Sequence, residues 1–316
     1  MKLIILLVGI ALSQFASADI VAGSFESKAL GVKKSYRVFL PSNYGKDERR
    51  YPVIYLLHGW GVTESYWADN LGLGDAAKSI GLDAIVVMPD GDRSYYADSV
   101  SPANYEACLA EENPKRNKNE PRSDFCVRKM DYEQYITVDL IEQIDRNYRT
   151  IADRKARGIS GESAGGFGAM QLAIRHKDLF SSVAVHSAFL SLLYDGPRPF
   201  SKGLVTNKSS IDPKGVNPDG LSTFGYGLGN WKAHDPISLV DTLRNGELSI
   251  YFDCGAQDEY GFGDEARYFD QRLSERGISH EYESVPGGHD DEFWKGRIRY
   301  SLQFHVNNFV KNGVYK

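Results

Sequence analysis

The chain has 316 residues and a formal net charge of −5 at pH 7. This mildly acidic balance lacks the basic surface that binding to nucleic acid or to an anionic membrane requires, so we expect neither kind of partner. The length suits one large α/β domain or two small ones.

Residues 1–18 have the features of a secretory signal peptide. A basic start precedes an apolar run from Leu3 to Leu12, and Ala16-Ser17-Ala18 forms an A-x-A cleavage pattern. The run is shorter than the ~20 apolar residues of a membrane span; the alternatives are a first core strand or a membrane anchor. We expect cleavage after Ala18, a secreted or periplasmic protein, and no stable membrane association.

Short apolar runs alternate with helical patterns along the rest of the chain. The runs 51–59, 83–91, 181–188 and 248–255 are apolar on both faces, which is typical of strands covered by helices on both sides. In residues 131–148 the apolar side chains form one helical stripe: Ile136, Leu140, Ile141 and Ile144. Residues 264–276 give a second helical pattern, followed by a glycine. This alternation predicts a doubly wound, mostly parallel α/β sheet, with 31–44 as an antiparallel edge strand.

Two segments interrupt the alternation, near residues 95–130 and 190–230. The first is long and polar, and the second is rich in glycine, proline and serine. Segments of this length inside a compact domain are usually functional or disordered. We find no interdomain linker, so residues 19–316 are expected to form a single domain that carries these two insertions.

The three cysteines indicate at most one disulfide. Cys108 and Cys126 bracket a polar loop in the first insertion, and export would place them in a compartment where disulfides form. We expect them to pair; the alternative is two free surface thiols. Cys254 then remains single and buried. The chain has no C-x-x-C or H-E-x-x-H pattern, so no metal site is expected.

The segment Gly161-Glu162-Ser163-Ala164-Gly165 matches the G-x-S-x-G pattern of a nucleophile elbow. In such an elbow a strand turns sharply into a helix and presents the serine at the tip. Residues 157–160 suit the strand and 164–174 the helix, and the two glycines prevent a collision where strand and helix cross. The alternative is that Ser163 is a small packing residue.

A serine nucleophile needs a base, and the base needs a carboxylate that fixes its tautomer. In α/β-hydrolases the chain order is serine, acid, histidine. Asp258 follows the predicted strand 248–255, and His289 lies on a glycine turn after another predicted strand. Chemistry gathers at the carboxyl ends of parallel strands, where Ser163, Asp258 and His289 all fall.

Other residues compete for these roles. Glu259 and Asp253 are alternative acids, and His186 and His234 are alternative bases. Neither histidine follows an acid on a glycine turn, so we favour His289.

An acyl transfer also needs two N–H donors for the oxyanion. The backbone N–H of Ala164, directly after the serine, is the first. The segment LLHGWG, residues 56–61, follows an early strand and offers the N–H of Trp60 as the second. The alternative for this segment is an ordinary turn at the end of a strand.

Taken together, these motifs resemble the esterase D-like family of α/β-hydrolases, which includes feruloyl and acetyl-xylan esterases, S-formylglutathione hydrolases and mycolyltransferases. The resemblance covers most of the mature chain and rests on four segments: 38–61, 161–170, 254–259 and 285–294. It implies an α/β-hydrolase fold, with Ser163 as nucleophile, Asp258 as acid and His289 as base, Trp60 and Ala164 at the oxyanion, and no cofactor. The two insertions depart from the family, and so does Ala164, where the family often has methionine.

The expected function is that of a secreted serine carboxylic-ester hydrolase. Its substrates would be feruloyl, acetyl or other short acyl esters of carbohydrate or small alcohols, either free or linked to polysaccharide. Tyr95, Tyr96 and Trp231 are candidates for an aromatic wall around the substrate, or else are packing residues. Three alternatives remain: an acyltransferase of the mycolyltransferase type, a thioesterase like S-formylglutathione hydrolase, and a binding protein without turnover. Export argues against the thioesterase, because glutathione thioesters are intracellular.

Overall fold

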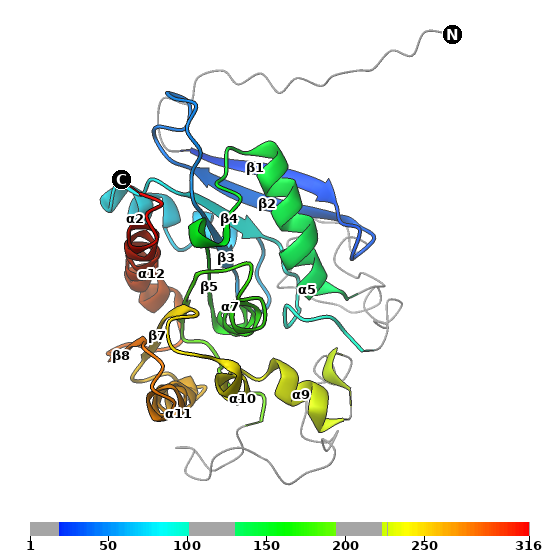
Figure 1. Cartoon of the computed structure of the whole chain (residues 1–316), viewed down its shortest axis with the longest axis vertical. Coiled ribbons are helices and arrows are strands. Elements are labelled where there is room, and N and C mark those ends of the chain that lie inside the picture. The colour runs from blue at the N-terminus through cyan, green and yellow to red at the C-terminus, as the bar shows by residue number, and fades with distance from the viewer. Residues whose placement is uncertain (1–18, 101–129, 194–222, 226, 316) are drawn as a thin grey trace.

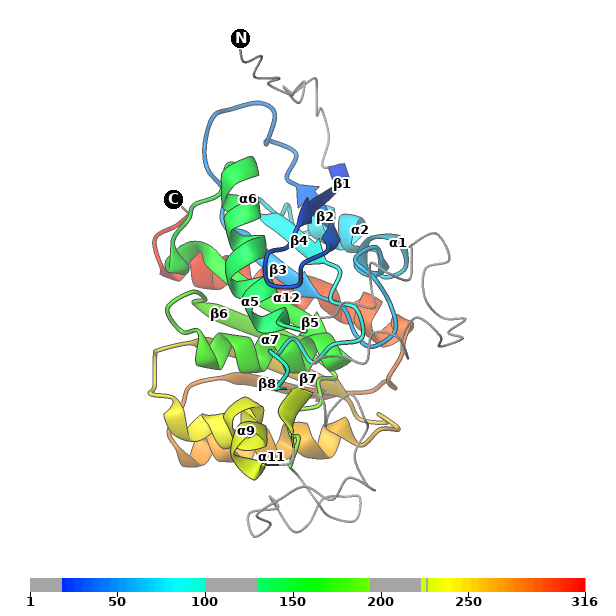
Figure 2. The ribbon, with the colours of Figure 1, turned by 90° about the vertical axis from the view of Figure 1, so that its right-hand side faces the viewer.

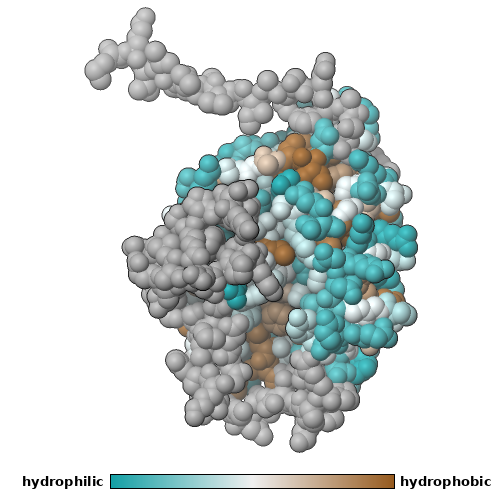
Figure 3. All heavy atoms as spheres, turned by 180° about the vertical axis from the view of Figure 1, so that it is seen from behind, coloured by the Kyte–Doolittle hydropathy of each residue, from teal (hydrophilic) through white to brown (hydrophobic). Residues whose placement is uncertain are grey.

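The computed structural model describes residues 19–100, 130–193, 223–225 and 227–315. The expected signal peptide lies outside the described residues, as do Cys108, Cys126 and most of both insertions. Among the described residues, no helix combines the length and the apolarity needed to span a membrane. The face drawn in Figure 3 is mainly hydrophilic over these residues, with a few apolar patches.

An eight-stranded sheet runs through the molecule in the order β1-β2-β4-β3-β5-β6-β7-β8 (Figure 1). The β1–β2 and β2–β4 pairs are antiparallel, and every other neighbouring pair is parallel. The strands are β1 (Asp19–Glu26), β2 (Lys33–Leu40), β3 (Val53–Leu57), β4 (Ile85–Pro89), β5 (Arg157–Glu162), β6 (Ser182–His186), β7 (Ser249–Gly255) and β8 (Glu281–Val285).

The central strands are buried on both faces, which is why their sequences are continuous apolar runs rather than alternating ones. Every residue of β3, β4 and β6 is buried. The expected doubly wound sheet is therefore confirmed. The antiparallel strand expected within 31–44 is β2, but it does not form the edge, because β1 pairs with it along its full length.

Helices cover both faces of this sheet (Figures 1 and 2). One face packs against α6, α7, α10 and α11, and the other against α2 and α12. Complete burial of one leucine or isoleucine side chain contributes about 1.5–3 kcal/mol, so the two apolar layers hold the sheet in place. The helices are α1 (Tyr66–Asp69), α2 (Leu73–Ser79), α5 (Tyr132–Gln134), α6 (Ile141–Asn147), α7 (Ser163–Arg175), α9 (Leu228–His234), α10 (Pro236–Leu239), α11 (Phe262–Glu275) and α12 (Asp291–Lys311).

The helical stripe predicted within 131–148 is present. Its helix is built from α5, a π-helical segment Tyr135–Leu140 and α6. All four side chains of the stripe are buried against the sheet. The second predicted pattern, 264–276, lies within and just after α11, and the following Gly277 has a φ of +66°, as expected of a glycine that ends a helix.

Candidate active site

Ser163 occupies the tight turn between β5 and α7. The strand ends at Glu162 and the helix begins at Ser163, whose φ is +50°. A left-handed conformation is strained for a serine and is common at functional sites. A Cβ at Gly165 would lie 2.5 Å from the carbonyl oxygens of Leu57 and His58, and one at Gly161 would overlap the backbone of Gly165. The glycines therefore permit the close crossing of strand and helix.

Ser163, His289 and Asp258 form one hydrogen-bonded chain. His289 Nε2 lies 3.0 Å from Ser163 Oγ, and His289 Nδ1 lies 2.8 Å from Asp258 Oδ2. Asp258 follows β7 and His289 follows β8, so all three residues stand at the carboxyl ends of parallel strands. The other oxygen of Asp258 accepts the backbone N–H of Tyr260 at 3.0 Å, which fixes the carboxylate.

The competing residues contact different partners. Glu259 accepts the backbone N–H of His289 at 3.1 Å. Asp253 and His186 bond to each other inside the core, at 2.9 Å. His234 is buried, with its Nδ1 2.8 Å from the carbonyl oxygen of Asn230. His186, Asp253 and His234 therefore have hydrogen-bond partners other than Ser163.

The backbone around Ser163 can receive negative charge. Because α7 begins at Ser163, the N–H of Ala164 has no carbonyl four residues earlier within the helix. The N-terminal end of a helix also carries partial positive charge. Trp60 lies in the loop after β3, half-buried, and lines the same hollow as His289.

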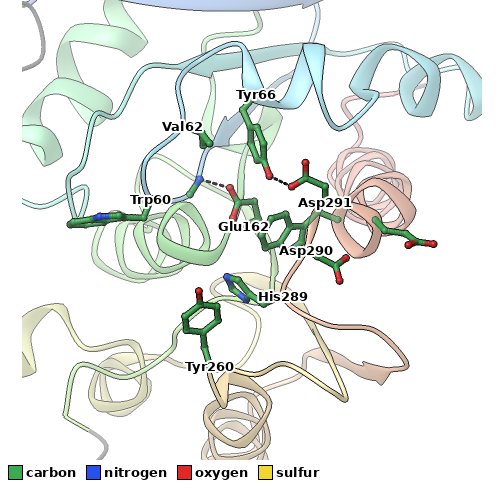
Figure 4. Close-up of a pocket in the computed structure, with 11 residues that line it drawn as sticks. Trp60, Val62, Tyr66, Glu162, Tyr260, His289, Asp290 and Asp291 are labelled. Atoms are coloured by element: carbon green, nitrogen blue, oxygen red, sulfur yellow. Dashed lines mark hydrogen bonds between the residues drawn. The ribbon is translucent and has the colours of Figure 1, made fainter. Parts of the chain in front are cut away.

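A pocket of about 600 Å³ opens beside His289 (Figure 4). Its walls combine aromatic rings with carboxylates, and Tyr66 donates a hydrogen bond to Asp291 across it. The lining residues are Gly59, Trp60, Val62, Tyr66, Glu162, Tyr260, His289, Asp290, Asp291, Glu292 and Trp294. Of these residues, Trp60 and His289 were predicted from the sequence. Glu162 could have been noticed, since it precedes the serine, whereas no sequence signal marks Tyr66 or Tyr260.

The three expected wall aromatics have different surroundings. Tyr95 is half-buried, and its ring centroid lies 5.2 Å from that of Trp60. Tyr95 therefore packs against a residue that lines the pocket. Tyr96 is 1% exposed, and its ring fills the space that side chains at Gly91 and Gly168 would need.

Trp231 is 4% exposed, with its ring against Phe224 and its Nε1–H donated to the carbonyl of Gly225 at 2.8 Å. The burial of Tyr96 and Trp231 favours the packing alternative for these two residues over a place in a substrate wall.

Burial changes the pKa of two groups near the hydrogen-bonded residues Ser163, His289 and Asp258. It raises the pKa of Glu162 to about 7, although the N–H of Gly59 and the nearby His58 and His289 oppose the rise. It also raises the pKa of the Cys254 thiol well above its usual range. Cys254 is a buried free thiol, as expected, and at neutral pH it is uncharged and a poor nucleophile. Across the described residues, no group of three or more histidine, cysteine or acidic side chains is arranged to hold a metal ion.

Curated relatives of this chain include esterases and S-formylglutathione hydrolases. An esterase from Mycobacterium tuberculosis is 29% identical over 279 residues, which is 84% of this chain and 54% of that protein. The chain therefore spans about half the length of the curated relatives that it matches first. An S-formylglutathione hydrolase from Bos taurus is 24% identical over 266 residues, covering 79% of this chain and 80% of the relative.

Solved structures share the fold. A ferulic acid esterase superposes with a TM-score of 0.68 at 24% identity, over 93% of this chain and 99% of that one. An S-formylglutathione hydrolase from Agrobacterium tumefaciens gives 0.69 at 19% identity, over 94% and 97%. The fold is that of the α/β-hydrolases, as predicted. Residues 27–304 match the family model described as "Putative esterase", and the chain belongs to that family.

Proposed function

We propose that this protein is a serine ester hydrolase that works through an acyl-enzyme intermediate. The observation that carries the proposal is the hydrogen bond of 3.0 Å between His289 Nε2 and the hydroxyl of Ser163, at a strained turn beside the pocket. Asp258, 2.8 Å from the other ring nitrogen, holds the imidazole in the tautomer that can accept a proton from the serine.

In the proposed reaction His289 takes the hydroxyl proton while Ser163 Oγ bonds to the carbonyl carbon of the ester. The N–H groups of Ala164 and Trp60 would receive the resulting oxyanion. The bond between carbon and the alcohol oxygen then breaks, and the proton on His289 goes to the leaving alcohol. In the second half, His289 takes a proton from water, and the hydroxide attacks the acyl-enzyme. The acid is released and Ser163 regains its proton.

For the substrate we propose feruloyl, acetyl or other short acyl esters of carbohydrate or small alcohols. Relatives named as feruloyl esterase and acetyl esterase support this class. A pocket of about 600 Å³ is of the size that holds small molecules. The rings of Trp60 and Tyr260 at its wall suit contact with a cinnamoyl or sugar ring. We also propose export, on the leader-like sequence of residues 1–18.

A fluorophosphonate probe tests the nucleophile. The wild-type protein should be labelled covalently, and the Ser163→Ala variant should not be labelled. Labelling that persists in the variant, or a folded wild type that resists the probe, would contradict the proposal.

Assays with p-nitrophenyl acyl esters, methyl ferulate and S-formylglutathione test the substrate class. Preference for the thioester would reject our proposed esters. Product analysis with an added acceptor alcohol tests hydrolysis, because a dominant new ester would identify an acyltransferase instead.

A further inference from the structure

Glu162 is a buried glutamate that lies between the nucleophile and the proposed oxyanion loop. It is 1% exposed, and no basic group in the described part of the chain forms an ion pair with it. A buried carboxyl group without an ion partner is costly, so its position calls for a reason. Its carboxylate accepts a hydrogen bond from the backbone N–H of Gly59, drawn as a dashed line in Figure 4.

The carbonyl group of Gly59 also has a hydrogen-bond partner. Its carbonyl oxygen lies 2.8 Å from Nδ1 of His58, while Nε2 of that ring accepts the N–H of Gly91 at 2.8 Å. The ring proton of His58 therefore sits on Nδ1 and is donated to the Gly59 carbonyl.

This geometry sets the direction of the neighbouring N–H. In a trans peptide the carbonyl and the following N–H point in opposite directions. The Gly59 carbonyl points to the His58 ring, which is 1% exposed. The N–H of Trp60 therefore points away from that buried ring, and both Gly59 and Trp60 line the pocket.

The contact between Glu162 and Gly59 is close. A Cβ at position 59 would overlap both carboxylate oxygens of Glu162, so a side chain there would displace the carboxylate from the Gly59 N–H. Glu162 is also the last residue of β5, directly before Ser163 and Ala164. One side chain thus joins the loop that carries one proposed donor to the turn that carries the nucleophile and the other donor.

We infer that Glu162 is a positioning residue, whose carboxyl oxygen accepts the Gly59 N–H and so aims the Trp60 N–H at the oxyanion of an ester under attack. The inference rests on the proposed function. The role needs a hydrogen-bond acceptor and not a charge. An ionised carboxylate, a protonated carboxyl and the amide of glutamine all supply one, whereas alanine and methionine do not.

The test compares Glu162→Gln, Glu162→Ala and Glu162→Met on p-nitrophenyl acetate. Glu162→Gln should keep kcat within about threefold. Glu162→Ala and Glu162→Met should lower kcat about tenfold to a hundredfold with KM little changed, because a misplaced group of this kind costs about a hundredfold. The inhibition constant of phenylboronic acid, which forms a tetrahedral adduct on the serine, should rise by the same factor.

Methionine fills the buried volume and so guards against misfolding of the alanine variant. Exposed Glu142 on α6, changed to alanine, is the matched control and should behave as the wild type. A Glu162→Met enzyme with wild-type kcat overturns the inference. A loss in Glu162→Gln equal to that in Glu162→Met also overturns it and assigns Glu162 a role that depends on its charge or proton. Failure of the proposed function is distinct, because the wild type would then resist the fluorophosphonate.

Discussion

Two serine–histidine–aspartate chains occur in the described part of this protein. In the first, His289 lies 3.0 Å from Ser163 and 2.8 Å from Asp258. In the second, which we call the core chain, His186 lies 2.9 Å from Ser301 Oγ and 2.9 Å from Asp253. Distances between side chains alone therefore do not distinguish an active site from a structural hydrogen-bond network.

The surroundings separate them. Ser301 and His186 are completely buried, and Ser301 also donates to the carbonyl of Ile298 in its own helix. Ser301 is in the middle of α12, where backbone N–H groups bond to carbonyls four residues earlier. Ser163 is half-buried at the start of a helix, in a strained conformation, beside a pocket. A serine nucleophile therefore needs access and nearby free N–H groups in addition to a base.

Replacing the two serines gives the largest expected contrast. Ser163→Ala should lower kcat about a millionfold, because the attacking atom is lost. Ser301→Ala should leave kcat within about twofold and lower the free energy of unfolding by about 1–3 kcal/mol, because a buried ring nitrogen loses its partner. Hydrolysis of p-nitrophenyl acetate and urea unfolding measure the two effects. Loss of turnover in a folded Ser301→Ala variant would contradict the purely structural role of Ser301.

Replacing Asp258 or Asp253 should give the same contrast between loss of activity and loss of stability. Asp258→Asn should lower kcat about ten-thousandfold, because the amide favours the wrong tautomer of His289. Asp253 accepts from His186, from Tyr251 and from Arg297 Nε at 2.8 Å, so Asp253→Asn should cost about 3–5 kcal/mol of stability. Turnover per folded molecule should survive in Asp253→Asn. Equal loss of kcat in both variants would show that the core chain supports the reaction.

The sequence was sufficient for features that depend on local pattern. The buried strands followed from apolar runs, and the turn at Ser163 followed from its glycines. Asp258 and His289 were predicted because each follows a strand, in the chain order serine, acid, histidine. In the structure, His289 is hydrogen-bonded to both Ser163 and Asp258. His186 and Asp253 were ranked lower on the same ground, since neither stands on a loop beyond a strand's end.

Features that depend on contacts between distant segments were not predictable in this way. Tyr96 has a φ of +53°, and its hydroxyl donates to the carbonyl of His58 at 2.7 Å, a partner 38 residues earlier. Nothing local to Tyr96 indicates that two glycines elsewhere make room for its ring. Strand β1 was not predicted, because residues 19–26 show only weak alternation of apolar and polar side chains. In the structure, this segment is a strand because it pairs with β2 along its full length.

The site and the core should also respond to pH in opposite directions. The native pKa of Glu162 is raised to about 7 from 4.5, so the native state holds a proton that the unfolded state has lost between these values. Glu162 therefore lowers stability as pH rises through this range. Burial lowers the pKa of His305, beside His186, to about 3 from 6.5, so His305 lowers stability as pH falls below 6.5.

Glu162→Gln removes the first of these effects. Relative to the wild type, the variant should gain about 2–3 kcal/mol in the free energy of unfolding between pH 5 and pH 8. The acid-side loss from His305 should be unchanged. Urea unfolding at several pH values measures both, and a variant whose stability parallels the wild type across this range would contradict the raised pKa.

Tyr260 gives the smallest expected effect and tests access directly. Its side chain is 52% exposed, and its ring centroid lies 4.8 Å from that of His289 at the wall of the pocket. Tyr260→Ala should raise KM for methyl ferulate about threefold to tenfold, the value of one aromatic contact, and change KM for p-nitrophenyl acetate less. Tyr300, an exposed tyrosine on α12 outside the pocket lining, is the matched control. An equal change in KM for both esters would place the feruloyl ring elsewhere, because a contact with that ring cannot affect an acetyl group.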